Sequence, residues 1–371
     1  MNQLKPTVLV IRRAFVASAL LATSAQIAVA QQEEVAVGVV STIAVSQTAS
    51  PFENSPQYLA NRSAGSNYSG VVNIWLRNAG GSVISGCTGS LLANGRILTA
   101  AHCISNGSAL TATSFTARFF QTGVGWVNVS GTGMAVKTGY TGAVVSENDV
   151  AVLTLNGAPP AWARTYSLAS GTVLGQTVTL AGYGRTGDGT TGSAFSNNQF
   201  NDNAVLRTGN NVFETTCQTS AANLINSGNC ATNASGLAAT QGGIFLADFD
   251  RNGLSTNGTV CTTLGFCTNS AGNSFMEVLT GPGDSGGANF LNDWTIAGVT
   301  SFGQVNSSNV GSFFGFAGGY TCVANIANNA GCQSNYEWVN AQVVPEPSTI
   351  ALMATGLLAM AVVSRRRRKS A

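Results

Sequence analysis

The sequence predicts an all-β domain with long loops, and three features carry this prediction. Charged residues make up 9% of the 371 residues, against about 25% in an average soluble protein. Glycine occurs 44 times and Ser, Thr and Asn are plentiful, so turn formers and β-branched residues predominate. Very few segments show the 3.6-residue apolar period of a helix with a charged opposite face. We expect one domain of roughly 250 to 280 residues with a tail at each end.

The N-terminus has the layout of a secretory signal peptide, which we expect to occupy residues 1–30. A basic region is followed by an apolar run over residues 14–29 and by the small-residue pattern Ala28-Val29-Ala30, which fits cleavage before Gln31. A retained anchor helix is the alternative. Residues 31–65 are expected to form a polar, irregular segment in the position of a propeptide.

The next segments predict strands joined by tight turns. The first strand is expected at residues 71–76, a second at 86–92, and Asn94-Gly95 is a hairpin signal before a third strand at 96–99. The hairpin brings Cys87 and Cys103 onto neighbouring strands, so a disulfide between them would fix the turn that carries His102. Farther on, an alternating apolar strand begins directly after Asp149.

His102 is the only histidine, and this fact limits the chemistry. One imidazole cannot form a multi-histidine metal site, so a functional His102 would carry a proton beside a nucleophile and a carboxylate. Asp149 and Ser285, in a glycine-framed loop at residues 281–288, are the matching partners. Taken alone, each has a plain interpretation: a turn histidine, a solvated aspartate at a strand start, and a turn serine. Together, in the order His, Asp, Ser, they favour nucleophilic catalysis.

The charge distribution argues against nucleic-acid binding. Eight of the 17 basic residues lie in the two tails, and residues 31–344 hold nine basic and 14 acidic residues, a net charge of −5. Such a domain does not attract a phosphate backbone. We expect neither nucleic acid nor a cofactor as a partner.

Eight cysteines in an exported chain suggest four disulfides. We expect pairing between sequence neighbours, namely Cys87 with Cys103, Cys217 with Cys230, Cys261 with Cys267, and Cys322 with Cys332. A weak calcium candidate is formed by Asp248, Asp250 and Asn252, which have the spacing of a calcium loop but lack its final Glu. A polar turn is the alternative there, and no metal is expected.

The C-terminal tail at residues 343–371 contains Pro345-Glu346-Pro347, an apolar stretch at residues 350–363 and a basic cluster at 365–369. In this order and spacing it resembles the PEP-CTERM sorting signal of Gram-negative bacteria. The stretch is short of the roughly 20 residues that span a bilayer comfortably. The resemblance implies a transmembrane segment that holds the chain transiently at the inner membrane, cleavage by an exosortase-type enzyme, and release to the cell surface or extracellular matrix. A permanent tail anchor is the alternative.

Five motifs follow one another between the tails: Thr-Ala-Ala-His-Cys at 99–103, Asn-Asp-Val-Ala-Val-Leu at 148–153, Gly-Tyr-Gly at 182–184, Gly-Asp-Ser-Gly-Gly at 283–287 and Ser-Phe-Gly at 301–303. With these motifs the chain resembles, over about residues 66–342, the chymotrypsin-like serine peptidases of the trypsin fold. The resemblance implies two packed six-stranded antiparallel β-barrels, at about 66–165 and 175–335, with the site in the cleft between them. It also implies a short C-terminal helix around Trp338.

The resemblance assigns roles to particular residues. Ser285 would be the nucleophile, His102 the general base and Asp149 the carboxylate that orients the imidazole, while the N–H groups of Gly283 and Ser285 would form the oxyanion hole. Substrate-binding positions would be Leu279 at the base of the primary pocket, Ser301 and Gly303. Because Leu279 is uncharged, an apolar residue is expected before the cleaved bond.

Two departures from the family pattern are present. No Ile-Val-Gly-Gly-type segment is evident whose new N-terminus could pair with Asp284, and Arg62-Ser63 is only a weak cut site. The distance from Gly184 to Ser285 is also larger than the family leads us to expect, which predicts a disulfide-stapled insertion at about residues 195–275 beside the substrate cleft.

The functional expectation is therefore a secreted or surface-attached serine endopeptidase that acts on protein or peptide substrates. The alternative is a catalytically silent binding or matrix protein that keeps the same shell.

Overall fold

A computed structural model describes most of the central domain. The described residues are 42–45, 60–143, 145–188, 192–195, 199–217, 242–248, 278–303 and 317–344. The predicted signal peptide at residues 1–30 and most of the sorting signal, from residue 345 onward, lie outside them. No helix among the described residues is long and apolar enough to cross a membrane. The apolar stretch at residues 350–363, predicted to be a transmembrane segment, lies outside the described residues.

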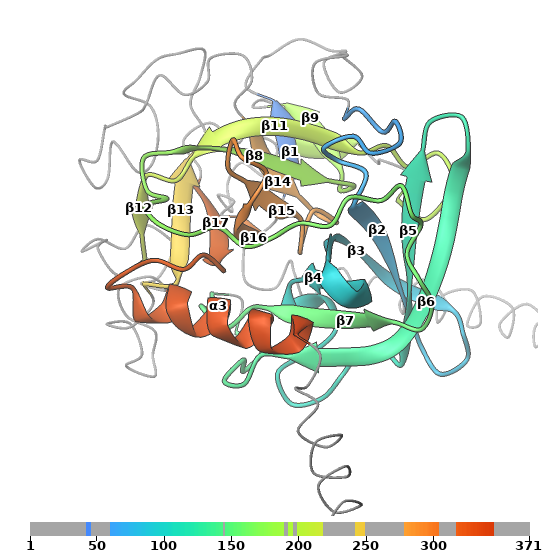
Figure 1. Cartoon of the computed structure of the whole chain (residues 1–371), viewed down its shortest axis with the longest axis horizontal. Helices are drawn as coiled ribbons and strands as arrows, with labels where there is room; N and C mark the ends of the chain where they lie inside the picture. Colours follow the sequence, from blue (N-terminus) through green and yellow to red (C-terminus); the bar gives the residue numbers. More distant parts are fainter. Residues whose placement is uncertain are drawn as a thin grey trace, which may run out of the picture.

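The first half of the domain is a closed six-stranded antiparallel barrel, as expected (Figure 1). Its order is β2-β3-β4-β7-β6-β5. The bounds are β2 Val71–Arg77, β3 Val83–Leu92, β4 Arg96–Thr99, β5 Ser114–Gln121, β6 Gly125–Val136 and β7 Ala151–Leu155. Strands β3 and β4 are joined by the 3-10 turn η3 (Ala93–Gly95), in which Asn94 and Gly95 both have positive φ. This conformation is the one the Asn-Gly hairpin signal predicts.

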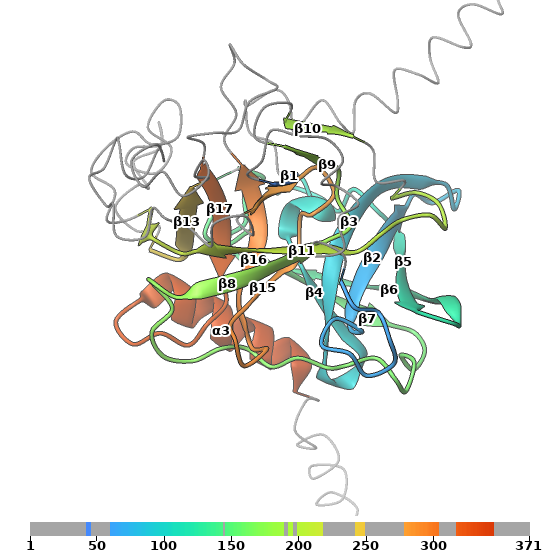
Figure 2. The ribbon, with the colours of Figure 1, turned by 90° about the horizontal axis from the view of Figure 1, so that it is seen from above.

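The second half is a curled antiparallel sheet of seven strands rather than a ring of six. Its order is β11-β8-β15-β16-β17-β13-β12. The bounds are β8 Thr177–Gly182, β11 Arg207–Val212, β12 Thr215–Thr216, β13 Ile244–Asp248, β15 Ala288–Phe290, β16 Ile296–Gly303 and β17 Ala317–Cys322. All eight residues of β16 are buried. Figure 2 shows this sheet packed beside the first barrel.

Part of the stretch predicted to be an insertion belongs to this sheet. Strand β11 pairs with β8 over six residues, and β13 pairs with β17 over five. Strand β13 starts with a continuous apolar run, Ile-Phe-Leu-Ala, whereas β11 is almost entirely polar, so neither shows the alternation that marks a half-exposed strand. Residues 207–217 and 242–248 of the predicted insertion at 195–275 are therefore part of the regular sheet, residues 218–241 and 249–277 lie outside the description, and the insertion itself stays a prediction.

A four-stranded sheet lies against the second half, in the order β10-β9-β1-β14. Its strands are β1 Thr42–Val45, β9 Thr186–Asp188, β10 Gly192–Phe195 and β14 Val278–Gly281. Strand β1 pairs antiparallel with β14 and parallel with β9. The prediction that residues 31–65 are irregular is therefore wrong at residues 42–45, because the neighbouring strands supply hydrogen-bond partners that the local sequence does not reveal.

The expected C-terminal helix is α3, Ala330–Val343. The Asn329 side chain caps its N-terminus by accepting a 3.0 Å hydrogen bond from the Cys332 N–H. The Cys322–Cys332 disulfide ties the helix to β17. At its other end, Arg96 of β4 donates from Nε to the Gln342 carbonyl at 2.8 Å, so α3 spans both halves of the domain, as Figure 1 shows.

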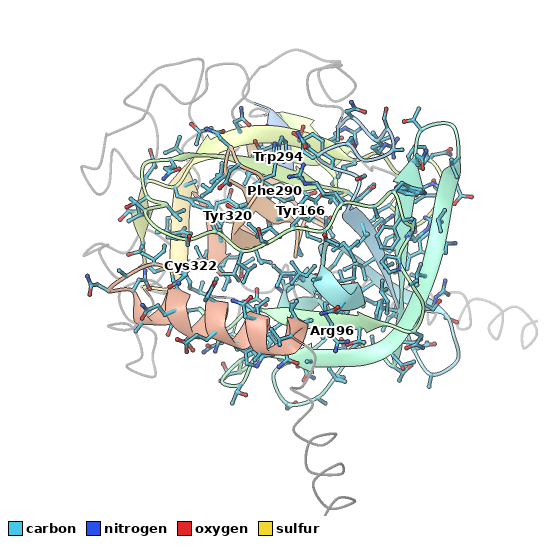
Figure 3. All side chains as sticks on the ribbon, viewed as in Figure 1. Arg96, Tyr166, Phe290, Trp294, Tyr320 and Cys322 are labelled. Carbon is cyan, nitrogen blue, oxygen red and sulfur yellow. A yellow bond between two sulfur atoms is a disulfide. The ribbon has the colours of Figure 1, made fainter. Side chains whose placement is uncertain are left out.

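Aromatic side chains fill the boundary between the halves. The ring of Tyr166, in the connection between them, lies 4.7 Å from that of Phe290 on β15, and the Phe290 ring lies 5.7 Å from that of Trp294. Figure 3 shows these three residues grouped together. The Trp294 ring in turn meets Tyr68, just before β2, at 5.0 Å. Such contacts fix the two halves relative to one another.

Candidate active site

His102 lies in the 3-10 turn η4 (Ala101–Cys103), which directly follows β4. The predicted Cys87–Cys103 disulfide is present and joins this turn to β3. Ala101 and Cys103, on either side of the histidine, are buried, whereas the His102 side chain keeps 21% of its surface exposed. The imidazole is therefore held on a fixed backbone while remaining accessible.

Asp149 orients this histidine through two hydrogen bonds. Its Oδ2 lies 2.7 Å from His102 Nδ1, and its Oδ1 accepts the His102 backbone N–H at 2.8 Å. Ser301 on β16 donates from Oγ to the same Oδ2 at 2.5 Å. A carboxylate only accepts, so the Nδ1 of His102 carries the proton and Nε2 keeps its lone pair. That tautomer is the one a general base needs.

The loop that carries Ser285 packs directly on the histidine turn. The Ser285 carbonyl accepts the Thr88 N–H at 2.9 Å and lies 3.8 Å from Cys103 Sγ. A Cβ added to Gly286, which has φ +81°, would lie 2.0 Å from Thr99 Oγ1. Only glycine fits this close approach. Ser285 therefore lies beside the turn that carries His102, and Asp149, just before β7, is hydrogen-bonded to that histidine.

The hydroxyl of Ser285 is buried, and among the described residues it has no hydrogen-bond partner. Within the same part of the chain, the N–H groups of Gly283 and Ser285 donate to no other residue, whereas those of Asp284, Gly286 and Gly287 all donate to backbone carbonyls. Buried backbone N–H groups are nearly always paired. The two exceptions, on either side of Asp284, form a site that can receive a negatively charged oxygen.

The orientation of the Gly283 N–H is set by its own peptide. The Pro282 carbonyl, on the other side of that peptide, accepts the Arg185 N–H at 2.8 Å. Carbonyl and N–H point in opposite directions across a trans peptide. The Gly283 N–H therefore points away from Arg185, and the φ of +98° at Gly283 allows the turn that follows.

Asp284 holds the base of this loop. Its carboxylate accepts the Gly184 and Gly281 N–H groups, each at 2.7 Å, and it is almost fully buried. Backbone donors thus stabilise the buried charge of the aspartate that the family resemblance would pair with a new N-terminus.

The predicted substrate-binding residues occupy two strands. Leu279 is buried on β14, and Gly303 at the end of β16 pairs with Gly318 of β17. A Cβ on Gly318 would lie 3.1 Å from Leu279 Cδ2, so the two glycines and the leucine are neighbours. The Ser301 side chain, in contrast, is engaged with Asp149, and the register of β16 shifts beside it, between Thr300 and Phe302.

Sequence reasoning missed Thr88, Gln199 and Gly318. Thr88 and Gln199 both donate to the Gly283 carbonyl, at 2.9 and 3.2 Å. Their contacts join positions 195 and 84 residues apart, so no local pattern points to them. The glycine pair at 318–319 before Tyr320 was a usable signal for a small side chain beside the pocket.

Two titratable groups near the loop are perturbed by burial. Burial raises the pKa of Tyr183 to about 12, against a smaller opposing effect of Arg62. Burial also lowers the pKa of the Arg118 guanidinium, opposed by its ion pair with Asp202. Tyr183 therefore stays neutral across the physiological range and adds no charge beside the site.

The remaining cysteine and metal predictions are tested only in part. Two predicted disulfides, Cys87–Cys103 and Cys322–Cys332, are confirmed. Cys217 is also disulfide-bonded, but Cys230, Cys261 and Cys267 lie outside the described residues, so the other two pairings stay predictions. Of the calcium candidate, only Asp248 is described, at the end of β13, while Asp250 and Asn252 are not.

Comparison with known proteins yields two family matches. The family model described as Trypsin matches residues 66–328, and the PEP-CTERM protein-sorting motif matches residues 343–368. Both resemblances predicted from sequence are thereby confirmed. No curated protein matched the chain.

Among solved structures, HL collagenase is similar with 19% sequence identity and a TM-score of 0.47, and the match covers 77% of this chain and 97% of the collagenase. The trypsin match spans more than two thirds of the chain, over the described strands and the site built on them. This chain belongs to the trypsin family and carries a PEP-CTERM sorting motif at its C-terminus.

Proposed function

We propose that this protein is a serine endopeptidase in which His102, Asp149 and Ser285 form the catalytic triad. The observation that supports it most strongly is the arrangement around Asp149, whose carboxylate accepts from Nδ1 and the backbone N–H of the only histidine. A second support is the pair of N–H groups at Gly283 and Ser285 that are unused among the described residues. Both features serve acyl transfer and neither is required for folding alone.

The reaction would follow from these positions in two halves. Ser285 Oγ attacks the scissile carbonyl carbon while His102 Nε2 accepts its proton, and the Gly283 and Ser285 N–H groups stabilise the oxyanion. His102 then protonates the leaving amine, which leaves an ester on Ser285. In the second half a water attacks the ester, gives its proton to His102 and releases the carboxylic acid. No cofactor takes part.

We propose that the residue before the cleaved bond is apolar. Leu279 brings no charge to the strand that the family resemblance places at the pocket base, and its neighbours Gly303 and Gly318 bring none either. Without a charged partner at this position Lys or Arg is penalised, because its charge would lose its water without compensation. Ser301 acts on Asp149 through its side chain.

We also propose export and processing. The PEP-CTERM motif supports a surface-directed protein, and its basic cluster and apolar stretch suit transient retention at the inner membrane before an exosortase-type enzyme cuts near Pro345-Glu346-Pro347. The substrate would then be a protein or peptide at the cell surface or in the matrix outside it.

The proposal is tested by labelling the exported protein with a serine-reactive fluorophosphonate. Wild type should label at Ser285, and Ser285→Ala and His102→Ala should abolish the label. Cleavage of a peptide library by wild type should then show an apolar preference, with Ser285→Ala reduced by roughly a million-fold. If the wild type does not label although its far-UV circular dichroism spectrum shows a folded protein, the result would instead support a catalytically inactive protein that uses this fold for binding.

A further inference from the structure

We propose that Thr88 and Gln199 are positioning residues that hold the Gly283 carbonyl and thereby fix the oxyanion-binding loop. The inference rests on the proposed function, because it concerns the donors of that site. Neither side chain is placed to touch a reacting atom; both act on the peptide that follows Gly283.

Thr88 engages its N–H, its carbonyl and its hydroxyl, the last as both donor and acceptor, and two of these four bonds go to the loop at residues 281–288. Its N–H donates to the Ser285 carbonyl at 2.9 Å, and its Oγ1 donates to the Gly283 carbonyl at 2.9 Å. The same Oγ1 accepts the Tyr183 N–H at 3.0 Å, and the Thr88 carbonyl accepts from Thr99 Oγ1 at 2.9 Å.

The direction of the Thr88 hydroxyl proton follows from these contacts. Because Oγ1 already accepts from the Tyr183 N–H, its single proton is available for Gly283. Thr88 is fully buried, so water does not compete for either bond. This one residue of the first barrel therefore binds the two carbonyls on either side of Asp284.

Gln199 is the second donor to the same carbonyl. Its Nε2 donates to the Gly283 carbonyl at 3.2 Å, and its side chain packs where a Cβ on Gly283 would lie, with Oε1 at 2.4 Å. Its backbone carbonyl accepts from Asn73 Nδ2 at 2.7 Å and from Trp75 Nε1 at 2.9 Å, both on β2. Gln199 is thus anchored on the first barrel while its side chain donates to the loop of the second half that carries Ser285.

The residues after Gln199 strengthen this anchor. The Arg118 guanidinium lies between the rings of Trp75 and Trp126, with Cζ 3.9 and 4.3 Å from the ring centroids, and it forms an ion pair with Asp202. Trp126 Nε1 donates to the Asp202 carbonyl at 2.9 Å. A buried cation between two indoles and a carboxylate is a stable support, so the segment at 199–202 does not move independently of the barrel.

The consequence concerns the Gly283 N–H. Arg185 holds the peptide that carries this N–H from one side, and Thr88 and Gln199 hold the next peptide from the other, so the N–H is fixed relative to the loop through the torsions of Gly283. The φ of +98° at Gly283 is one option among several for a free chain. Two donors on the Gly283 carbonyl select that conformation before substrate arrives. Preorganised donors of this kind stabilise the transition state more than the bound substrate, so their loss should lower kcat and leave KM nearly unchanged.

The test compares Thr88→Val, which removes the hydroxyl at constant shape, with Thr88→Ser, which keeps it. We expect kcat per titrated active site to fall by about 10- to 100-fold in Thr88→Val, with KM within about twofold, because complete loss of one oxyanion donor costs about 100- to 1,000-fold. Thr88→Ser should stay within about threefold of wild type. Affinity for a peptide aldehyde, which forms an oxyanion on Ser285, should weaken in parallel with kcat. Equal kcat values for the two variants would overturn the proposal.

A second variant and a second measurement keep the result decisive. If Thr88→Val does not fold, Gln199→Met, which keeps the length and removes the donor, should show a smaller loss of kcat in the same direction. Hydrogen exchange over residues 281–287 should accelerate in Thr88→Val and not in Thr88→Ser. An unchanged exchange rate in Thr88→Val would contradict the positioning role of Thr88, whether or not the wild type is active. An inactive wild type would refute the proposed peptidase activity and leave the exchange result as the test of the positioning role.

Discussion

At the scale of single residues, Asp149 determines what His102 can do. It accepts the Nδ1 proton, the backbone N–H of the same residue and the Ser301 hydroxyl, at 2.7, 2.8 and 2.5 Å. These bonds fix both the tautomer and the ring orientation. An uncharged amide at this position could donate to Nδ1 and so place the proton on Nε2, where it blocks general-base catalysis.

We therefore expect Asp149→Asn to lower kcat by about four orders of magnitude at neutral pH with little change in stability. The measurement is the rate at which the fluorophosphonate phosphonylates Ser285, with release of fluoride, alongside peptide hydrolysis. Ser301→Ala is the matched control, since it removes one bond to the carboxylate and keeps the charge, and should cost about tenfold or less. An Asp149→Asn protein within tenfold of wild type would mean that another group orients His102.

At the scale of elements, the strand β1 supports the strand that carries Leu279. Its register on β14 pairs Ile43 with Thr280 and Ala44 with Leu279, and its other edge pairs with β9. A strand paired on both sides uses every N–H in a ladder. Residues 42–45, in the region predicted to be a propeptide, thus support the strand that carries the predicted substrate-binding residue Leu279.

This arrangement predicts the effect of a proline in β1. Ile43→Pro removes one ladder donor and introduces a ring between two paired strands, so β14 should loosen and KM for an apolar substrate should rise several-fold. Ile43→Val keeps the ladder and is the control. Peptide hydrolysis at a series of substrate concentrations makes the comparison. Equal KM values for the two variants would show that β1 does not support the pocket.

At the scale of the whole molecule, Glu147 links the first barrel to the second half. Its Oε2 accepts the Gly243 N–H at 3.2 Å, and its backbone carbonyl accepts from Asn335 of α3 at 2.7 Å. Burial raises the pKa of its carboxyl above the usual value near 4.5, with the Gly243 N–H and Lys137 opposing this shift. The folded protein therefore holds this proton more tightly than the unfolded chain does.

The sign of the pH dependence follows from that difference. A carboxyl whose pKa is raised on folding makes the protein less stable as pH rises from 4.5 through its folded pKa. The reason is that the unfolded chain loses this proton first and the folded protein must then either keep it or bury the charge. Glu147→Gln removes this titration. The melting temperature of the variant relative to wild type should therefore increase between about pH 4 and pH 7. A difference that stays constant or decreases over this range would contradict the assignment.

The sequence by itself determined the class of the protein and the residues at its centre. An all-β composition, the Asn94-Gly95 hairpin, the single histidine and the Gly-Asp-Ser-Gly-Gly loop are local patterns, and each reflects a backbone or chemical requirement that neighbouring residues satisfy. For the same reason the Cys87–Cys103 bridge, across one hairpin, could be predicted.

Only the tertiary structure decided the rest, because the remaining contacts join distant segments. The pairing of β1 with β14, the inclusion of β11 and β13 in the second sheet, and the two donors on the Gly283 carbonyl connect positions tens to hundreds of residues apart. Fully buried strands show no alternation, and a threonine or glutamine side chain donates to whatever carbonyl the fold brings near. Local sequence specifies the reacting groups, and the packing of the two halves specifies how they are held.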